Sequence, residues 1–283
     1  MPLIGCFVTP HPPIIVPEVG GHELARVEST VKAMLALSDE MASLAPDTIV
    51  LLSPHAPLAK YQMAVSLARA YRGSFDHFMA PQVVLQEEGD VEVGTAILEE
   101  ASRHGIPATA TGSNEAAYEL DHGTMVPLYY LTSKLSTPAK LVLLSFSYLD
   151  VDEHVRFGRA IGDALRSSPK RIAYVASSDL SHRLTPQAPA GFDPRGAEFD
   201  HAVVDLFSKN DWEGLLSLNG GLVAAAGECG YRSLAVLSGI VEALSESGSR
   251  AQNRLLSYEG PFGVGYMVGR VDLSPAELVE AQG

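Results

Sequence analysis

The sequence predicts an α/β fold, in which a single domain holds a central mixed, largely parallel sheet flanked by helices. Three observations support this prediction. Short apolar runs alternate with stretches that carry apolar residues at helical spacing, which is typical of strands connected by helices. The 283-residue chain is 46% hydrophobic and 19% charged, so it can bury a sizeable core. Because it contains neither internal repeats nor a low-complexity linker, residues 1–283 are interpreted as one domain.

The elements of the first half follow from apolar runs and from the residues that end them. Proline follows both of the buried strands, and His104-Gly105 is a helix stop signal. The predicted elements are, in order, a strand at 3–8, a helix at 22–44, a strand at 48–53, one or two strands within 61–86, and a helix at 90–104.

The second half shows the same alternation and ends in a glycine-punctuated apolar run. We expect its last two strands to pair at an edge of the sheet. The predicted elements are a helix at 123–135, a strand at 140–147, a helix at 152–166, a strand at 171–177, helices at 196–208, 211–218 and 230–246, and strands at 252–258 and 261–273.

Charge and composition argue against several classes of partner. There are 34 acidic and 20 basic side chains, a net charge of −14, which disfavours nucleic acid and anionic membranes. No window of about 18 residues is apolar enough for a membrane span. The two cysteines, Cys6 and Cys229, indicate a reducing compartment, and the N-terminus lacks a signal-peptide core, so we expect a cytoplasmic protein. A homo-oligomer is expected from base rates alone.

Three of the nine histidines, His11, His55 and His182, follow predicted strand ends, where open α/β sheets bind ligands. His11 and His55 both lie between prolines, in Pro10-His11-Pro12 and Pro54-His55-Ala56-Pro57, which stiffens the turns that present the imidazoles. A lone histidine at a strand end is more often an ordinary surface residue, but three at equivalent positions favour a shared site. Five others are interpreted as solvated or capping residues: His22, His77, His104, His154 and His201.

Two histidines leave a metal site incomplete, and Glu228 is the acidic candidate to complete it. Two histidines and one carboxylate form the facial triad of non-haem Fe(II) enzymes. Cys229 follows directly, and a thiolate ligand would favour softer ions or different redox chemistry, so both residues stay open as the third ligand. Zn(II) or another divalent metal is the alternative, because the same donors can activate water in a hydrolase.

Six segments carry a resemblance to a known family over about residues 3–270, which leaves a short C-terminal tail. They are CFVTPHPPIIVPEVG, LLSPHAP, ELDHGTMVPLYYL, SSDLSHRL, GECGYRSLAVL and SYEGPFGVGYMVG. Together they resemble the LigB superfamily, the catalytic subunits of class III extradiol ring-cleavage dioxygenases and their Memo-type relatives. Each motif is weak alone, and the combination is specific.

The resemblance implies one catalytic domain, a non-haem Fe(II) extradiol dioxygenase that cleaves a small catechol-type aromatic ring with O2. It implies that His11, His55 and Glu228 bind the metal. His182 is then the catalytic acid/base, a role that suits a histidine because it titrates near working pH, and His122 contacts substrate. Asp179, three residues before His182, is a candidate to orient it. The alternatives are a Memo-like metal-binding or redox protein without ring cleavage, for which Memo-type relatives offer a cysteine near position 229, and a Zn-dependent hydrolase.

Overall fold

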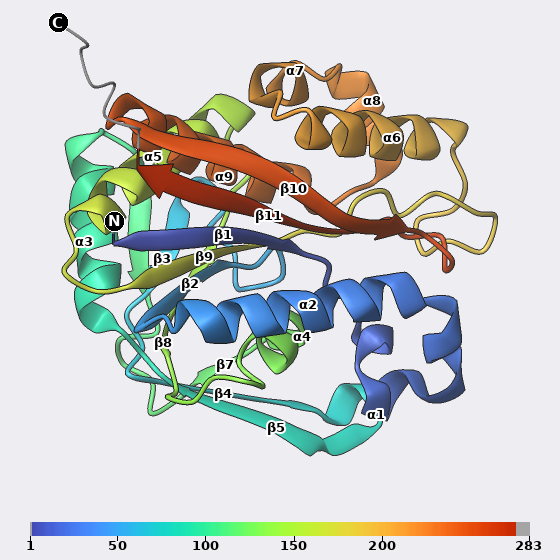
Figure 1. Cartoon of the computed structure of the whole chain (residues 1–283), viewed down its shortest axis with the longest axis horizontal. Coiled ribbons are helices and arrows are strands. Elements are labelled where there is room, and N and C mark those ends of the chain that lie inside the picture. The colour runs from blue at the N-terminus through green and yellow to red at the C-terminus, as the bar shows by residue number, and fades with distance from the viewer. Residues whose placement is uncertain (1, 276–283) are drawn as a thin grey trace, which may run out of the picture.

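Two sheets organise residues 2–275, the part of the chain that this computed structural model describes (Figure 1). The larger has the strand order β10-β11-β1-β9-β2-β8-β3-β6 and the smaller the order β5-β4-β7. The strands are β1 (Leu3–Thr9), β2 (Thr48–Leu52), β3 (Met63–Ser66), β4 (Ala70–Phe75), β5 (Ala80–Glu88), β6 (Ala108–Thr111), β7 (Tyr118–Glu119), β8 (Lys140–Ser145), β9 (Ile172–Ser177), β10 (Ser249–Glu259) and β11 (Tyr266–Pro275).

The centre of the large sheet is parallel. β1, β9, β2 and β8 pair in parallel register, and antiparallel β11 and β3 flank them. β2 and β9 are buried along their whole length, which is why both read as continuous apolar runs rather than as alternating patterns. These pairings confirm the predicted α/β fold with a mixed, largely parallel sheet.

Helices cover both faces of this sheet. They are α1 (Pro17–Gly20), α2 (Glu28–Leu44), α3 (Val91–Arg103), α4 (His122–Leu131), α5 (Val151–Arg166), α6 (Pro194–Ser208), α7 (Trp212–Leu216), α8 (Gly220–Ala226) and α9 (Tyr231–Glu246). α3, α5, α6 and α9 pack on one face, while α2, α4 and the small sheet pack on the other (Figure 1). Each face of the sheet has its own hydrophobic core, and alternate residues of β2 pack into the two cores. Val50 and Leu52 belong to the first face, and Ile49 and Leu51 to the second.

Some elements differ from the sequence prediction. Residues 61–86 contribute to three strands rather than one or two, and these strands are divided between the two sheets. The helix expected from residue 22 begins as a 3-10 turn at Gly21–Arg26, and α2 proper starts at Glu28. β6, β7 and α8 were not predicted; β6 has the sequence ATAT, which lacks a large apolar residue to mark it. The closing strands β10 and β11 lie at the sheet edge, as expected.

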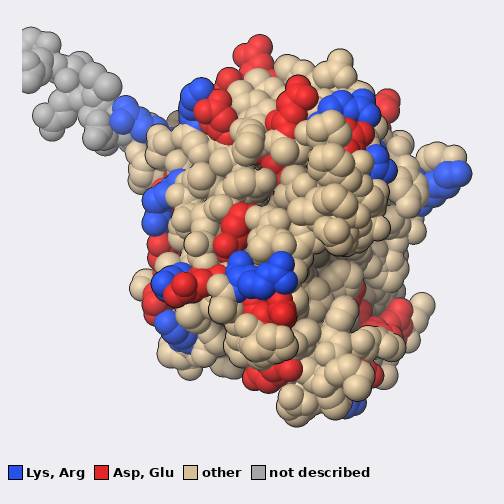
Figure 2. Space-filling model, turned by 90° about the vertical axis from the view of Figure 1, so that its right-hand side faces the viewer, with Lys and Arg blue, Asp and Glu red and all other residues tan. Residues whose placement is uncertain are grey.

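The carboxyl ends of β1, β9 and β2 lie side by side, because these strands are parallel neighbours. This end of the sheet is the right-hand side of Figure 1, which faces the viewer in Figure 2. There the coloured acidic and basic side chains are interspersed around a hollowed, mostly uncharged surface. Within residues 2–275, no helix is both long and apolar enough to cross a membrane.

Candidate metal centre

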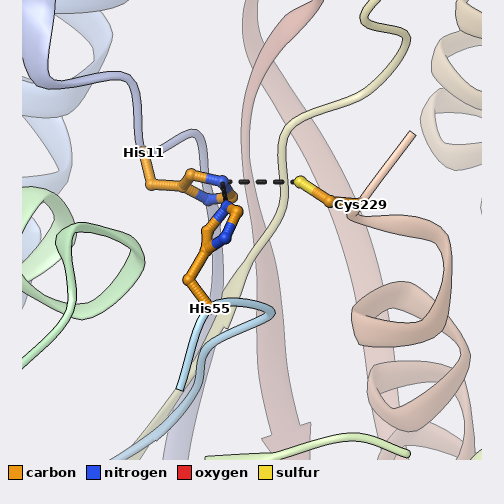
Figure 3. A group of neighbouring side chains, drawn as sticks. All are labelled: His11, His55 and Cys229. Carbon is orange, nitrogen blue, oxygen red and sulfur yellow. Dashed lines mark hydrogen bonds between the residues drawn. The ribbon is translucent and has the colours of Figure 1, made fainter. Parts of the chain in front are cut away.

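His11 is the buried centre of the site at the strand ends. It follows β1, and its residue is only 1% exposed. The His11 backbone N–H donates to Asp179 Oδ1 at 2.8 Å, and ring atom Nδ1 lies 2.8 Å from Ser177 Oγ. Ser177 ends the neighbouring strand β9, and Asp179 lies two residues beyond it. Backbone and ring are therefore fixed by the same strand, and the Nε2 edge is directed toward His55 and Cys229 (Figure 3).

His55 follows β2 and lies at the solvent side of His11. Its backbone N–H donates to Ser53 Oγ at 3.2 Å, and its Nε2 is 3.1 Å from His11 Nε2. The two rings meet edge-on, with centroids 4.8 Å apart. The two histidines follow parallel strands that flank β9 on either side, and they converge as the sequence predicted.

Cys229 completes a group of three potential ligands with these histidines (Figure 3). Its Sγ lies 3.5 Å from His11 Nε2, and the ligand atoms of all three side chains are within 4.8 Å of one another. The loop between α8 and α9 approaches closely because of its glycines. Gly227 has a left-handed φ of +62°, and a Cβ on Gly230 would lie 2.1 Å from Ser178 Oγ.

Glu228 lies outside this group. Its Oε2 accepts a hydrogen bond from the Tyr231 backbone N–H at the start of α9. Its residue lines a different cavity of about 400 Å³, together with Tyr231 and Arg232. Among the residues described, the geometry therefore favours Cys229, the alternative that the sequence left open, over Glu228 as the third donor.

The protonation states follow from burial. Burial, and then the neighbouring histidines, hold the pKa of His11 well below its usual range. Desolvation and the neighbouring His122 lower the pKa of His55 to about 4. Burial, aided by the charges of Asp179 and Glu228, raises the pKa of the Cys229 thiol well above its usual value. At neutral pH the imidazoles are thus neutral, and the thiol keeps its proton unless a cation replaces it.

His122 and His182 belong to the same cluster of histidines. His122 opens α4, whose N-cap is Asp121, and its ring centroid is 4.2 Å from that of His55 and 5.8 Å from that of His11. His182 lies close enough for its charge to lower the pKa of both His11 and His55. Its buried Nδ1 has no hydrogen-bond partner within the described part of the chain. The structure thus brings together all four histidines that the sequence assigned to one site.

Asp179 contacts His11 rather than His182. Besides its bond to the His11 backbone, its Oδ2 lies 3.5 Å from His11 Nε2. The structure therefore does not support the expectation that Asp179 orients His182. The turn after β9 faces the end of β1, so Asp179 contacts His11 instead. Burial raises the pKa of Asp179 to about 7.

A cavity of about 360 Å³ opens beside the histidines. His55 and His122 line it from the side of the metal centre, and Phe78 and Met125 add apolar surface. The Phe78 ring lies 5.7 Å from the His122 ring. Its other lining residues are Pro57, Ser74, Asp76, His77, Glu119, Leu120 and Asp121.

The sequence missed several residues around this site. Ser177 and Phe78 carried no metal-site motif, since only their place in the fold brings them to the histidines. His77, interpreted from the sequence as solvated or capping, is exposed and lines the cavity. Asp121 had a usable signal, because aspartate is favoured at the position just before a helix; its side chain accepts from the Thr124 N–H. His154, expected to be solvated or capping, is instead fully buried in α5.

The residues present fit a transition metal. Both imidazoles are neutral, a polarisable sulfur lies beside them, and all three donors come from segments that other contacts hold in place. Such a donor set suits ions that accept thiolate, including zinc, copper and iron. It departs from the two-histidine, one-carboxylate pattern expected from the sequence, since Glu228 lies outside the group.

Sequence comparisons identify a protein family and two relatives that are similar to this chain. The model of the family described as "Catalytic LigB subunit of aromatic ring-opening dioxygenase" matches residues 5–269. "Protein CA_C1420" of Clostridium acetobutylicum is 37% identical over 277 residues, which cover 96% of this chain and 58% of that protein. A "MEMO1 family protein" of Methanosarcina acetivorans is 25% identical over 183 residues, which cover 63% of this chain and 62% of that protein.

The fold is also similar to a solved structure. The crystal structure of uncharacterized protein JW3007 from Escherichia coli K12 has a TM-score of 0.63 at 14% identity, covering 94% of this chain and 99% of that chain. This likeness concerns the fold alone. The chain spans 58% and 62% of the two curated relatives named above.

Proposed function

Because this chain belongs to the LigB family, we propose that it is a Memo-like metal-binding redox protein, with His11, His55 and Cys229 as the metal ligands. The observation that carries the proposal is the position of Cys229 Sγ, 3.5 Å from His11 Nε2. A partly buried thiol whose sulfur lies within 4.8 Å of the ligand atoms of two neutral imidazoles gives a softer donor set than a carboxylate would. When bound, a metal such as iron or copper supplies electron exchange with a small molecule.

The chain's own residues supply binding and proton management around that centre. The cavity beside His122 offers the Phe78 ring and the Met125 side chain to a small, flat substrate. His122 and His182 are neutral at pH 7, because burial lowers the pKa of each, so either can accept a proton from a bound hydroxyl.

Extradiol ring cleavage is the second candidate, and the cluster of four histidines favours it. Under this hypothesis, His11, His55 and Glu228 would hold Fe(II). His182 would be the acid/base, and His122 would contact a catechol-type substrate. It requires the Glu228 carboxylate to leave the Tyr231 N–H and to turn toward the histidines.

Separate substitutions of Glu228 and Cys229 distinguish these two candidate functions. The wild type, Cys229→Ser and Glu228→Gln are loaded anaerobically with Fe(II), Cu(I) or Zn(II) and desalted, and retained metal is measured by elemental analysis. We expect Cys229→Ser to weaken retention at least about tenfold, whereas Glu228→Gln stays within about twofold. Cys6→Ala is the matched control, since Cys6 is a buried thiol of the large core rather than of the site. The opposite order for residues 228 and 229 would contradict the proposed ligand set.

Ring cleavage is tested separately. The Fe(II)-loaded protein is mixed with oxygen and a panel of catechols, and oxygen uptake and ring-opened products are followed. The Memo-like proposal expects no ring-opened product from protein with bound iron. Sustained cleavage that His182→Gln abolishes would establish the dioxygenase instead. The metal found in protein purified without added metal distinguishes both from a zinc hydrolase.

A further inference from the structure

We propose that Ser177 is a positioning residue of the metal centre, and that its hydroxyl holds His11 in the tautomer that leaves Nε2 free to bind a metal. This inference rests on the proposed metal site. It concerns the last residue of β9, which contacts His11 but none of the other proposed ligands by hydrogen bond among the residues described.

The Ser177 hydroxyl has a single proton to donate. Ser177 Oγ lies 2.6 Å from the Gly123 backbone oxygen and 2.8 Å from His11 Nδ1. A carbonyl oxygen can only accept, so the hydroxyl proton must point to Gly123. The hydroxyl then has only lone pairs to offer to His11, and Nδ1 must be the donor. A neutral imidazole that carries its proton on Nδ1 has its lone pair on Nε2.

The other tautomer would create a repulsive contact. If the Nδ1 of a neutral His11 were unprotonated, the hydroxyl proton could satisfy only one of its two neighbours. Either the 2.6 Å contact with Gly123 or the 2.8 Å contact with His11 would then bring two lone pairs together. Ser177 is fully buried and His11 is 1% exposed, so water has little access to this contact and cannot readily supply the missing hydrogen-bond donor.

Gly123 makes this arrangement possible. A Cβ at this position would lie 2.5 Å from Ser53 Oγ and 2.9 Å from Asp121 Oδ1, so only glycine lets the first turn of α4 come this close. His122 precedes Gly123 directly. The Ser177 hydroxyl therefore connects the end of β9 both to the ring of His11 and to the turn that carries His122.

The tautomer can be read directly in the metal-free protein. With histidines labelled in both ring nitrogens, long-range 1H–15N correlation spectra distinguish an Nδ1–H from an Nε2–H imidazole. The His11 signals are assigned by their loss in His11→Gln. We expect His11 of the wild type to be the Nδ1–H tautomer, and an Nε2–H tautomer there would overturn the proposal whatever any variant does.

Three variants test the role of the hydroxyl. Ser177→Ala removes it, Ser177→Thr retains it, and Ser238→Ala is a matched control that removes a buried hydroxyl which donates to a backbone carbonyl within α9. We expect Ser177→Ala to give a mixture of His11 tautomers and to weaken Zn(II) affinity about 10- to 100-fold. Ser177→Thr should restore both readouts, and Ser238→Ala should leave both unchanged. Unchanged tautomer and affinity in Ser177→Ala would overturn the proposal.

These readouts separate the inference from the proposed function. The tautomer is measured without metal, and Zn(II) affinity is measured without turnover. If Ser177→Ala changes both while the iron- or copper-loaded wild type shows no redox activity, the positioning role stands and the proposed function fails. If the wild type is redox-active but its His11 is the Nε2–H tautomer, the function stands and the positioning role fails.

Discussion

At the scale of single residues, the site is organised around His11 and opens at His55. His11 is almost fully buried. Its backbone N–H contacts Asp179, its Nδ1 contacts Ser177, and its Nε2 faces His55 and Cys229. His55 is exposed and shares the cavity with His122. A small molecule from solvent therefore reaches His55 and His122 first, while His11 and Cys229 form the protected side of the centre.

The third ligand shows the limit of sequence reasoning at this scale. Glu228 and Cys229 are neighbours in a short loop, so their side chains leave the backbone in different directions. One carboxylate oxygen accepts from the first N–H of α9, and the sulfur faces His11. The sequence motif predicts that this loop lies at the site. It cannot predict which of the two adjacent side chains faces the metal, because a shift of the turn by one residue would exchange the directions in which they point.

Metal uptake should release a proton from Cys229. Its thiol is protonated at neutral pH, since burial raises its pKa, whereas the two histidines are already neutral because their pKa values are lowered. Binding must therefore displace one proton, and the apparent Zn(II) affinity should rise about tenfold per pH unit near pH 7. Calorimetry in two buffers of different ionisation enthalpy counts this proton.

The matched variants sharpen this measurement. Cys229→Ala should bind more weakly, release no proton and lose the pH dependence, whereas Cys6→Ala should behave as the wild type. An affinity that is independent of pH in the wild type would show that the thiol is not the group that gives up a proton to the metal.

At the scale of elements, the sequence predicts best what depends on local pattern. β1, β2, β8 and β9 are continuous apolar runs, and the prolines after β1 and β2 mark the turns that carry His11 and His55. β7 has only two residues and pairs with β4 residues that lie 47 positions earlier in the chain, so no local pattern predicts it. The small sheet beside the cavity of His122 was therefore not predicted as a separate sheet, although one or two strands within 61–86 and the neighbouring helix α4 were.

The packing of α5 on α9 should depend on two glycines. A Cβ on Gly158 would lie 2.0 Å from the Val236 backbone oxygen, and one on Gly239 would lie 2.0 Å from that of Val155. Gly158→Ala must push the helices apart and should lower the free energy of unfolding by about 1–3 kcal/mol. Gly220→Ala is the control, because no atom lies within 4 Å of its added Cβ in α8. Urea unfolding measures both, and equal effects would contradict the close-packing argument.

At the scale of the whole molecule, the proposed ligands join parts that are far apart in the chain. His11 and Cys229 are separated by 218 positions, and His55 comes from a third segment after β2. A metal held by all three would link the carboxyl ends of β1 and β2 with the start of α9. Because these segments reach the metal only in the folded chain, binding must favour the folded state over the unfolded one.

Thermal unfolding should therefore report the metal centre. At a free Zn(II) concentration of 100 times Kd, linkage adds about 2.7 kcal/mol to the free energy of unfolding. For a chain of this size that corresponds to a rise in Tm of about 5 °C, which a chelator should reverse. Cys229→Ala should lose most of the rise and Glu228→Gln should keep it, with Cys6→Ala as the control for loss of a thiol. A rise that survives in Cys229→Ala but disappears in Glu228→Gln would return the ligand role to the carboxylate.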